Sequence, residues 1–234
     1  MNPATPAALG AAPDLSRHRV LLFDLDGTLV DSIGDIRACV NLVRAEQGLA
    51  PLEEEDVRRA VGEGARVLTR RTLAPVIDGE ARLELLYHRL LHWYEERAVV
   101  ETRLYPLARE FLELAQSAGV GLAMVTNKPL GITQKVLDAL DLRHRFARVW
   151  CPENSLHIKP DPRAVLEPLA ELAIPPAEAA FLGDSIHDFA AARGAGVRVV
   201  GMRHGYFVPG EPEPDSWVDG YGSLIAAWGH DGRR

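Results

Sequence analysis

The sequence predicts an α/β fold built on a mostly parallel β-sheet, with a small all-helical unit inserted after the first strand. Two observations carry this prediction. Short continuous apolar runs alternate with helical segments, which is typical of strands buried on both faces of a parallel sheet. The first run is then followed by about seventy residues with several helical patterns and no strand-like alternation, an interval too long for an ordinary crossover.

The first strand is predicted over residues 19–24, where the apolar run VLLF ends at Asp24. A second strand, VGLAMVTN, begins at Val120 and follows the amphipathic stretch REFLELAQSAG, in which Gly119 is typical of a helix C-terminus. Three more strands are predicted over residues 148–151, over residues 179–182 and from Val197 onward. We therefore expect a Rossmann-like core.

The inserted segment, residues 32–103, is predicted to form a helical bundle over the sheet. Its hinges are expected near residues 31–34 and 105–106. The core is then formed by residues 18–31 and 104–234, and the Ala- and Pro-rich residues 1–17 are expected to be a disordered tail.

Composition narrows the range of partners. With 234 residues, 47% hydrophobic and 25% charged, the chain has globular proportions, and its net charge of −7 opposes binding to nucleic acid or to anionic membranes. Two cysteines without zinc-ligand spacing, the lack of a secretory signal and the lack of an apolar run of roughly 20 residues favour a reduced, cytoplasmic setting. An anionic small molecule would then need a locally cationic pocket.

The most informative polar residues follow the first strand. Asp24 and Asp26 stand two apart in DLDGTLVDS, where the chain turns at Gly27. Ligands collect at the carboxyl ends of parallel strands, and two carboxylates there favour a hard cation such as Mg²⁺. The pair could instead cap a helix or decorate a turn. An EF-hand is excluded, because Gly27 is fourth and not sixth from Asp24.

Three further signals fall at or near later strand ends. Thr126 and Asn127 in VTNKP offer a hydroxyl and backbone N–H groups to a phosphoryl oxygen, although Thr126 could be an ordinary helix N-cap. Lys159 in HIKPDP could supply a fixed positive charge or be a surface lysine. Asp184 and Asp188 in GDSIHD stand four apart, on one side of a helix if one begins there.

Each signal is weak alone, but their order along the chain is specific. DLDGTLVDS, VTNKP, IKPDP and GDSIHD resemble the four motifs of the haloacid dehalogenase superfamily. Three further segments, VGEGARVLTRRTL, VTNKP and HGYF…GEPEPDSWVDGYGSL, make the chain similar to phosphoglycolate phosphatases within it. It departs from them at Glu63, Leu107 and Phe207, where an uncharged polar residue, glycine and asparagine are expected.

The resemblance implies a Mg²⁺-dependent phosphatase that hydrolyses 2-phosphoglycolate through an aspartyl-phosphate intermediate. Asp24 is implied as the nucleophile and Asp26 as the general acid and base. Asp24, Asp26, Asp184 and Asp188 are implied to form the metal site. Thr126, Asn127 and Lys159 are then expected to bind the phosphoryl group, with Thr126 and Lys159 stabilising its charge during transfer.

The insert is expected to select the substrate. Gly62 and Gly64 allow close backbone approach, and Arg71 on the same helix face is expected to bind the substrate carboxylate, with Arg66 and Arg70 as competitors. All three arginines could instead be solvated. A phosphatase or phosphomutase for another small ester, such as a sugar phosphate, a metal-free dehalogenase and a non-catalytic phosphate-binding protein are the alternatives. Asp26 argues against the dehalogenase, and monomer and homodimer both remain open.

Overall fold

The computed structural model describes residues 11–206 and 212–230, so Phe207 lies outside the described residues. Its main sheet has six parallel strands in the order β5-β4-β1-β6-β7-β8. The strands are β1 Val20–Phe23, β4 Gly121–Val125, β5 Val149–Trp150, β6 Ala179–Gly183, β7 Arg198–Met202 and β8 Ser216–Val218. The predicted α/β class with a Rossmann-like parallel core is confirmed.

The register of the central strands brings their carboxyl ends to one edge of the sheet. Phe23, the last residue of β1, is paired with Met124 in β4 and with Leu182 in β6. The residues that follow these strands therefore emerge side by side. The turn after each strand, and not the strand itself, supplies the polar side chains.

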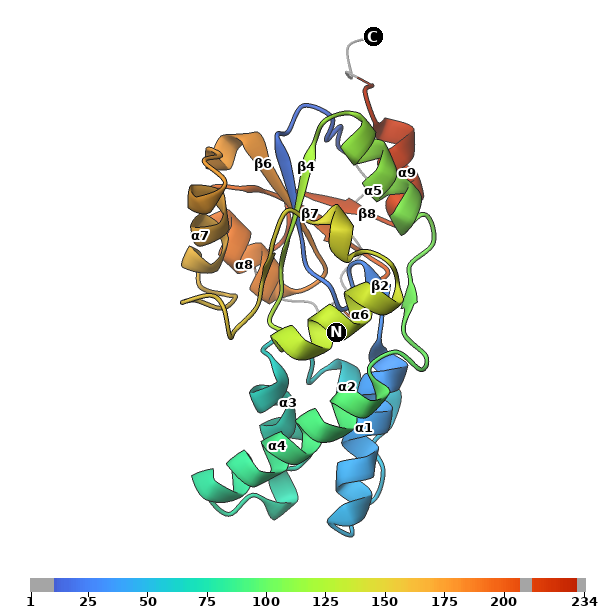
Figure 1. The fold of residues 1–234 in the computed structure, drawn as a ribbon, viewed down its shortest axis with the longest axis vertical. Coiled ribbons are helices and arrows are strands. Elements are labelled where there is room, and N and C mark those ends of the chain that lie inside the picture. Colours follow the sequence, from blue (N-terminus) through green and yellow to red (C-terminus); the bar gives the residue numbers. More distant parts are fainter. Residues whose placement is uncertain (1–10, 207–211, 231–234) are drawn as a thin grey trace, which may run out of the picture.

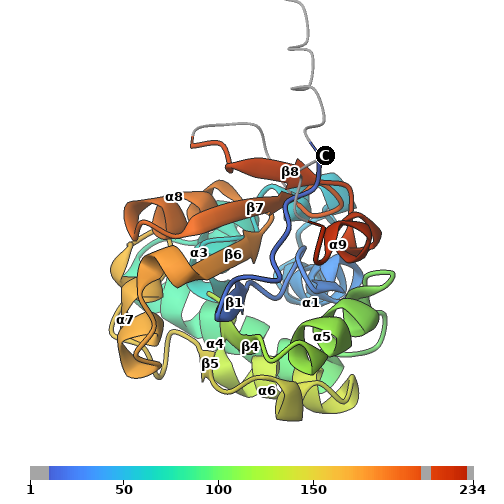
Figure 2. The ribbon, with the colours of Figure 1, turned by 90° about the horizontal axis from the view of Figure 1, so that it is seen from above.

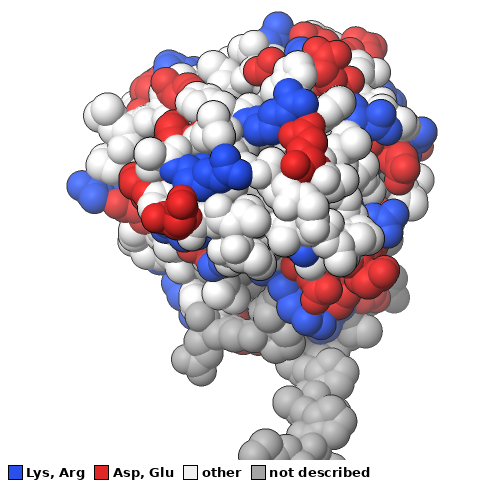
Figure 3. All heavy atoms as spheres, turned by 90° about the horizontal axis from the view of Figure 1, so that it is seen from below, with Lys and Arg blue, Asp and Glu red and all other residues white. Residues whose placement is uncertain are grey.

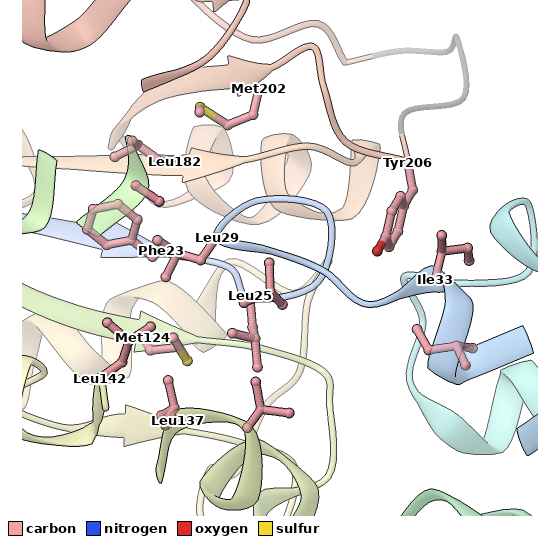
Figure 4. Packing of buried hydrophobic residues seen from close by; sticks show 14 of the residues in the cluster. Phe23, Leu25, Leu29, Ile33, Met124, Leu137, Leu142, Leu182, Met202 and Tyr206 are labelled. Atoms are coloured by element: carbon pink, nitrogen blue, oxygen red, sulfur yellow. The ribbon is translucent and has the colours of Figure 1, made fainter. Parts of the chain in front are cut away.

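Helices cover both faces of the sheet, as Figure 2 shows. One face carries α5 Ala108–Ser117, α6 Leu130–Ala139 and α9 Tyr221–Ala227, and the other carries α7 Arg163–Glu171 and α8 Ile186–Gly194. Figure 4 shows the first face from close by, with Phe23, Met124 and Leu182 pointing into one apolar cluster. The ring of Phe23 also makes edge contacts with Phe111 and Phe146. Short 3₁₀ turns span Ala74–Val76, Arg143–Arg145 and Pro176–Glu178.

Four helices lie beyond the carboxyl edge of the sheet, and we call them the cap (Figure 1). They are α1 Ile33–Glu46, α2 Glu54–Arg58, α3 Ala65–Thr72 and α4 Glu80–Arg97. The buried carboxylate of Asp35 in α1 accepts hydrogen bonds from the backbone N–H groups of Val100, Glu101 and Thr102. This contact fixes the chain leaving α4 against the start of α1.

Two features of the sheet structure were not predicted. Strands β2 Val30–Asp31 and β3 Arg103–Leu104 pair antiparallel where the cap joins the core, and β8 adds a sixth strand at the sheet edge. All three have two or three residues. A segment that short carries no readable alternation, so only its pairing partner makes it a strand.

Both ends of the described chain pack on the core. Residues 1–10 of the expected tail lie outside the described residues, but Leu15 is buried and Asp14 accepts a hydrogen bond from the N–H of Gly229. Gly119 follows the C-cap Ala118 of α5 and has φ of +78°, so it ends this helix as the sequence predicted. Among the described residues no helix is long and apolar enough to cross a membrane.

Viewed from the cap end, acidic and basic side chains alternate without a large patch of one sign (Figure 3).

Candidate active site

Three carboxylates meet at the carboxyl edge of the sheet. Asp24 directly follows β1, Asp184 directly follows β6, and Asp188 lies in the first turn of α8. All three are buried, and one oxygen of each lies within 4.8 Å of the others. The tertiary structure therefore joins residues that are 160 positions apart in sequence into one acidic cluster.

The turn after β1 depends on Gly27. This residue has φ of +79°, and the carbonyl of Leu25 accepts the N–H groups of Leu29 and Val30 to close the turn. A Cβ at Gly27 would lie 2.3 Å from Oδ2 of Asp184. Only glycine fits between the turn and this carboxylate.

A buried lysine offsets part of the acidic charge. The ammonium of Lys159 lies 2.7 Å from Oδ1 of Asp24 and 2.6 Å from Oδ1 of Asp188, and its side chain is 2% exposed. Lys159 is therefore not a surface lysine, although its neighbouring prolines allowed that interpretation. Its backbone N–H donates to Oδ1 of Asn127 at 3.1 Å, which fixes the loop that carries it.

Asp188 contacts both the start of α8 and the ammonium of Lys159. Its Oδ2 accepts from the backbone N–H groups of Asp184 and Ser185, and Ser185 in turn caps the N–H of Asp188. Its other oxygen remains directed at Lys159. The two interpretations of GDSIHD, a helix start and a functional acid pair, are thus compatible.

The electrostatics of the cluster favour a cation. Burial raises the pKa of Asp24 to about 6, and burial together with Asp188 and Asp24 raises the pKa of Asp184 well above its usual value. Three buried carboxylates lie together, Lys159 contacts two of them, Asp24 and Asp188, and Oδ1 of Asp24 accepts no well-aligned hydrogen bond. An all-oxygen, net-negative donor set of this kind fits Mg²⁺, which would offset the excess charge.

Thr126 and Asn127 lie in the cavity beside this cluster. Thr126 is not a helix N-cap, because α6 starts at Leu130 with Pro129 before it. Asn127 connects three parts of the site. Its amide nitrogen donates to the carbonyls of Gly62 in the cap, at 2.9 Å, and of Lys159, at 2.8 Å.

Asp26 has a partner that the sequence analysis did not single out. The ammonium of Lys128 lies 2.8 Å from Oδ1 and 3.0 Å from Oδ2 of Asp26, and Ser32 donates to Oδ1 at 2.5 Å. Tyr94 of α4 and Tyr206 also line the cavity. The position of Lys128 in VTNKP, in the turn that follows β4, was the one signal in the sequence for this contact.

The cap closes over a cavity of about 60 Å³ between α3 and the strand ends. Gly62 and Gly64 line it. Arg71 does not: its guanidinium pairs with Glu63 and its side chain is 43% exposed. The two competing arginines also face acidic residues of α4 and not the cavity. Arg66 pairs with Glu80 and Glu84. Arg70 lies 4.0 Å from Glu80.

Glu63 is turned away from the cavity as well. It pairs with Arg71 and lies 3.6 Å from Nε2 of His187. Its charge is thereby partly neutralised outside the cavity. This departure from phosphoglycolate phosphatases does not place a negative charge against a substrate anion. The second departure, Leu107, adopts φ of +63°, a conformation that glycine adopts without strain.

The arrangement matches a known family. The family model of haloacid dehalogenase-like hydrolases matches residues 21–202, and the chain belongs to this family. Two curated relatives within it, described below, are phosphatases. The protein is accordingly a phosphoric monoester hydrolase.

The relatives differ in substrate. The chain is 33% identical over 201 residues to the N-acetylmuramic acid 6-phosphate phosphatase of Pseudomonas aeruginosa, covering 86% of this chain and 88% of that one. It is 37% identical over 210 residues to the phosphoglycolate phosphatase of Agrobacterium fabrum, covering 88% and 90%. The crystal structure of a predicted phosphoglycolate phosphatase from Haemophilus somnus has a TM-score of 0.84 at 30% identity, covering 90% and 97%.

Proposed function

We propose that the protein hydrolyses 2-phosphoglycolate to glycolate and phosphate, with Mg²⁺ as cofactor and an aspartyl phosphate as intermediate. The observation that carries the choice of substrate is the small cavity between α3 and the acidic cluster. The site chemistry supports the class of reaction, and the dimensions of the cavity support the substrate.

Asp24 is the proposed nucleophile. It lines the cavity, and Lys159 holds one of its oxygens while the other can face phosphorus. Attack on phosphorus breaks the ester P–O bond and forms the aspartyl phosphate, which water then hydrolyses. Asp24, Asp184 and the main-chain carbonyl of Asp26 would hold Mg²⁺, with Asp188 beside them. When bound, the cation would neutralise charge between the phosphoryl group and the nucleophile.

Asp26 is the proposed general acid and base, because its carboxylate also lines the cavity and is partly exposed to it. It gives a proton to the departing ester oxygen and later takes one from the attacking water. Thr126 lines the cavity, and the ammonium of Lys159 lies against the Asp24 oxygen beside it. They are suited to bind the oxygens whose charge must be stabilised during transfer.

The glycolate carboxylate is assigned to the amino end of α3. Gly64 and Ala65 line the cavity, and Gly64 provides no side chain to cap the first N–H groups of this eight-residue helix. Uncapped N–H groups and the helix dipole favour an anion there. This assignment replaces the arginine expected from sequence with backbone donors from the same segment.

Size separates the proposed substrate from the sugar phosphates. A cavity of about 60 Å³ favours a compact ester, such as the phosphate of a two-carbon acid, over an ester with bulky substituents. N-Acetylmuramic acid 6-phosphate carries a sugar ring with lactyl and acetamido substituents. It would fit only if α3 moved away from the strand ends.

A phosphate-release assay tests the proposal. We would measure kcat/KM for 2-phosphoglycolate, N-acetylmuramic acid 6-phosphate and glucose 6-phosphate, with Mg²⁺ and with EDTA, and would analyse the glucose 6-phosphate reaction for isomeric products. We expect 2-phosphoglycolate to be preferred by at least about 100-fold. A higher kcat/KM for either sugar phosphate would overturn the assignment, and an isomeric sugar phosphate would indicate a phosphomutase.

A further inference from the structure

Lys128 is a buried cation in the cavity that the proposed mechanism does not use. Its side chain is 1% exposed, and its three N–H donors are accounted for by both oxygens of Asp26 and the hydroxyl of Tyr94. The ammonium also lies 4.4 Å from the centre of the Tyr94 ring. In this arrangement no donor of Lys128 is left for a substrate.

The contacts of Lys128 join the core to the cap. Lys128 and Asp26 belong to turns after core strands, whereas Tyr94 lies in α4 of the cap and is itself buried. On its far side, Asp26 is held by the hydroxyl of Ser32, whose backbone N–H donates to the hydroxyl of Tyr206 at 2.7 Å. The carboxylate of Asp26 is thus held from two sides. Lys128 connects it to the cap, and Ser32 holds it at the junction between core and cap.

We propose that Lys128 is a positioning residue for Asp26, and that Tyr94 makes this positioning depend on the cap being closed. The inference rests on the proposed role of Asp26. As the ester P–O bond breaks, its electron pair must take the proton held by Asp26, which requires a fixed carboxyl orientation. Opening of the cap would remove Tyr94 from Lys128 and loosen the carboxyl when no substrate is enclosed.

Leaving-group dependence distinguishes positioning from general structural damage. Ethyl phosphate and acetyl phosphate are similar in size, but ethoxide needs a proton to leave and acetate does not. We expect Lys128→Met to lower kcat/KM for ethyl phosphate and 2-phosphoglycolate about 100-fold, and for acetyl phosphate less than about 3-fold. Tyr94→Phe should shift the ratio of ethyl to acetyl phosphate in the same direction, by about 10-fold.

Two matched variants control for lost contacts. Lys135→Met removes a lysine contact from α6 to the carbonyl of Glu95 in α4, away from Asp26, and Tyr87→Phe removes a hydroxyl from the same helix as Tyr94. Both should leave the ratio of ethyl to acetyl phosphate unchanged. Because Tyr94→Phe keeps the buried ring, it tests the proposal even if Lys128→Met folds poorly.

Three results would overturn the proposal. An equal fall for ethyl and acetyl phosphate in Lys128→Met would show a structural role only. A fall for 2-phosphoglycolate alone would make Lys128 a carboxylate-binding residue. An unchanged ratio in Tyr94→Phe would remove the cap from the mechanism. An error in the proposed substrate would give a different result. The wild-type enzyme would then prefer a sugar phosphate, and the ratios of ethyl to acetyl phosphate in the variants would be unaffected.

Discussion

The two walls of the cavity are built in different ways. The core wall presents charged side chains from strand ends: the carboxylates of Asp24 and Asp184 are buried within 4.8 Å of each other, and Lys159 contacts Asp24. The cap wall presents backbone at Gly62 and Gly64, apolar side chains of α1 and α3, and Tyr94 of α4, while the arginines of α3 pair with acidic residues outside the cavity. The comparison indicates that the core supplies the chemistry and that the cap selects by shape and by N–H groups.

Asp24→Asn should have the largest effect, because it removes the nucleophilic charge from the core wall and keeps its shape. We expect kcat for 2-phosphoglycolate to fall on the order of 10⁴-fold or more. Circular dichroism and Tm should match those of the wild type. Retention of more than a few per cent of wild-type turnover would contradict a covalent mechanism at this residue.

Removal of Mg²⁺ should have the next largest effect on the core wall. With EDTA we expect kcat/KM to fall about 1000-fold, since the buried carboxylates would then oppose the phosphate. Mg²⁺ should restore activity and raise Tm, whereas Ca²⁺, with its longer and looser coordination, should not restore activity. Full activity in EDTA would favour a metal-free mechanism, and an unchanged Tm would argue against cation binding by the cluster.

Gly64→Ala tests whether the backbone of the cap wall matters. Gly64 has φ of +86°, and an added Cβ would lie 3.2 Å from the carbonyl oxygen of Asn127. The methyl group should hold the cap away from the core and lower kcat/KM for 2-phosphoglycolate about 10-fold.

Gly48→Ala is the matched control for Gly64→Ala. Gly48 also lies in the cap with positive φ, +69°, but a Cβ there meets nothing within 4 Å. Its substitution should cost about 1 kcal/mol of unfolding free energy by strain alone and leave kcat/KM unchanged. An equal loss of activity in both variants would show that strain, and not the cavity wall, is responsible.

Arg71→Ala should have the smallest effect, because Arg71 faces Glu63 outside the cavity. We expect kcat/KM for 2-phosphoglycolate to change by less than about 3-fold, the range for loss of an exposed ion pair. The same measurement with p-nitrophenyl phosphate, which has no carboxylate, provides the comparison. A loss of 10-fold or more for 2-phosphoglycolate alone would return Arg71 to the substrate site and contradict the comparison above.

The core was predictable because its signals are local. A buried parallel strand reads as an apolar run, and the polar residue that ends it must emerge at the sheet edge, so Asp24, Thr126 and Asp184 could be placed before their contacts were known. The cap arginines lacked such a signal. Arg71 sits on a helix whose rotation toward the core or toward solvent depends on packing against α4.

The sequence by itself determined the fold class, the helical insert and the order of residues that form the acidic cluster. Only the tertiary structure decided which charges face each other: Lys128 on Asp26 and Tyr94, Arg71 on Glu63, and Lys159 between Asp24 and Asp188. The physical reason is the distance along the sequence over which each interaction acts. Backbone and burial preferences act over a few neighbouring residues, whereas charge pairing depends on distances between segments that only the packed chain fixes.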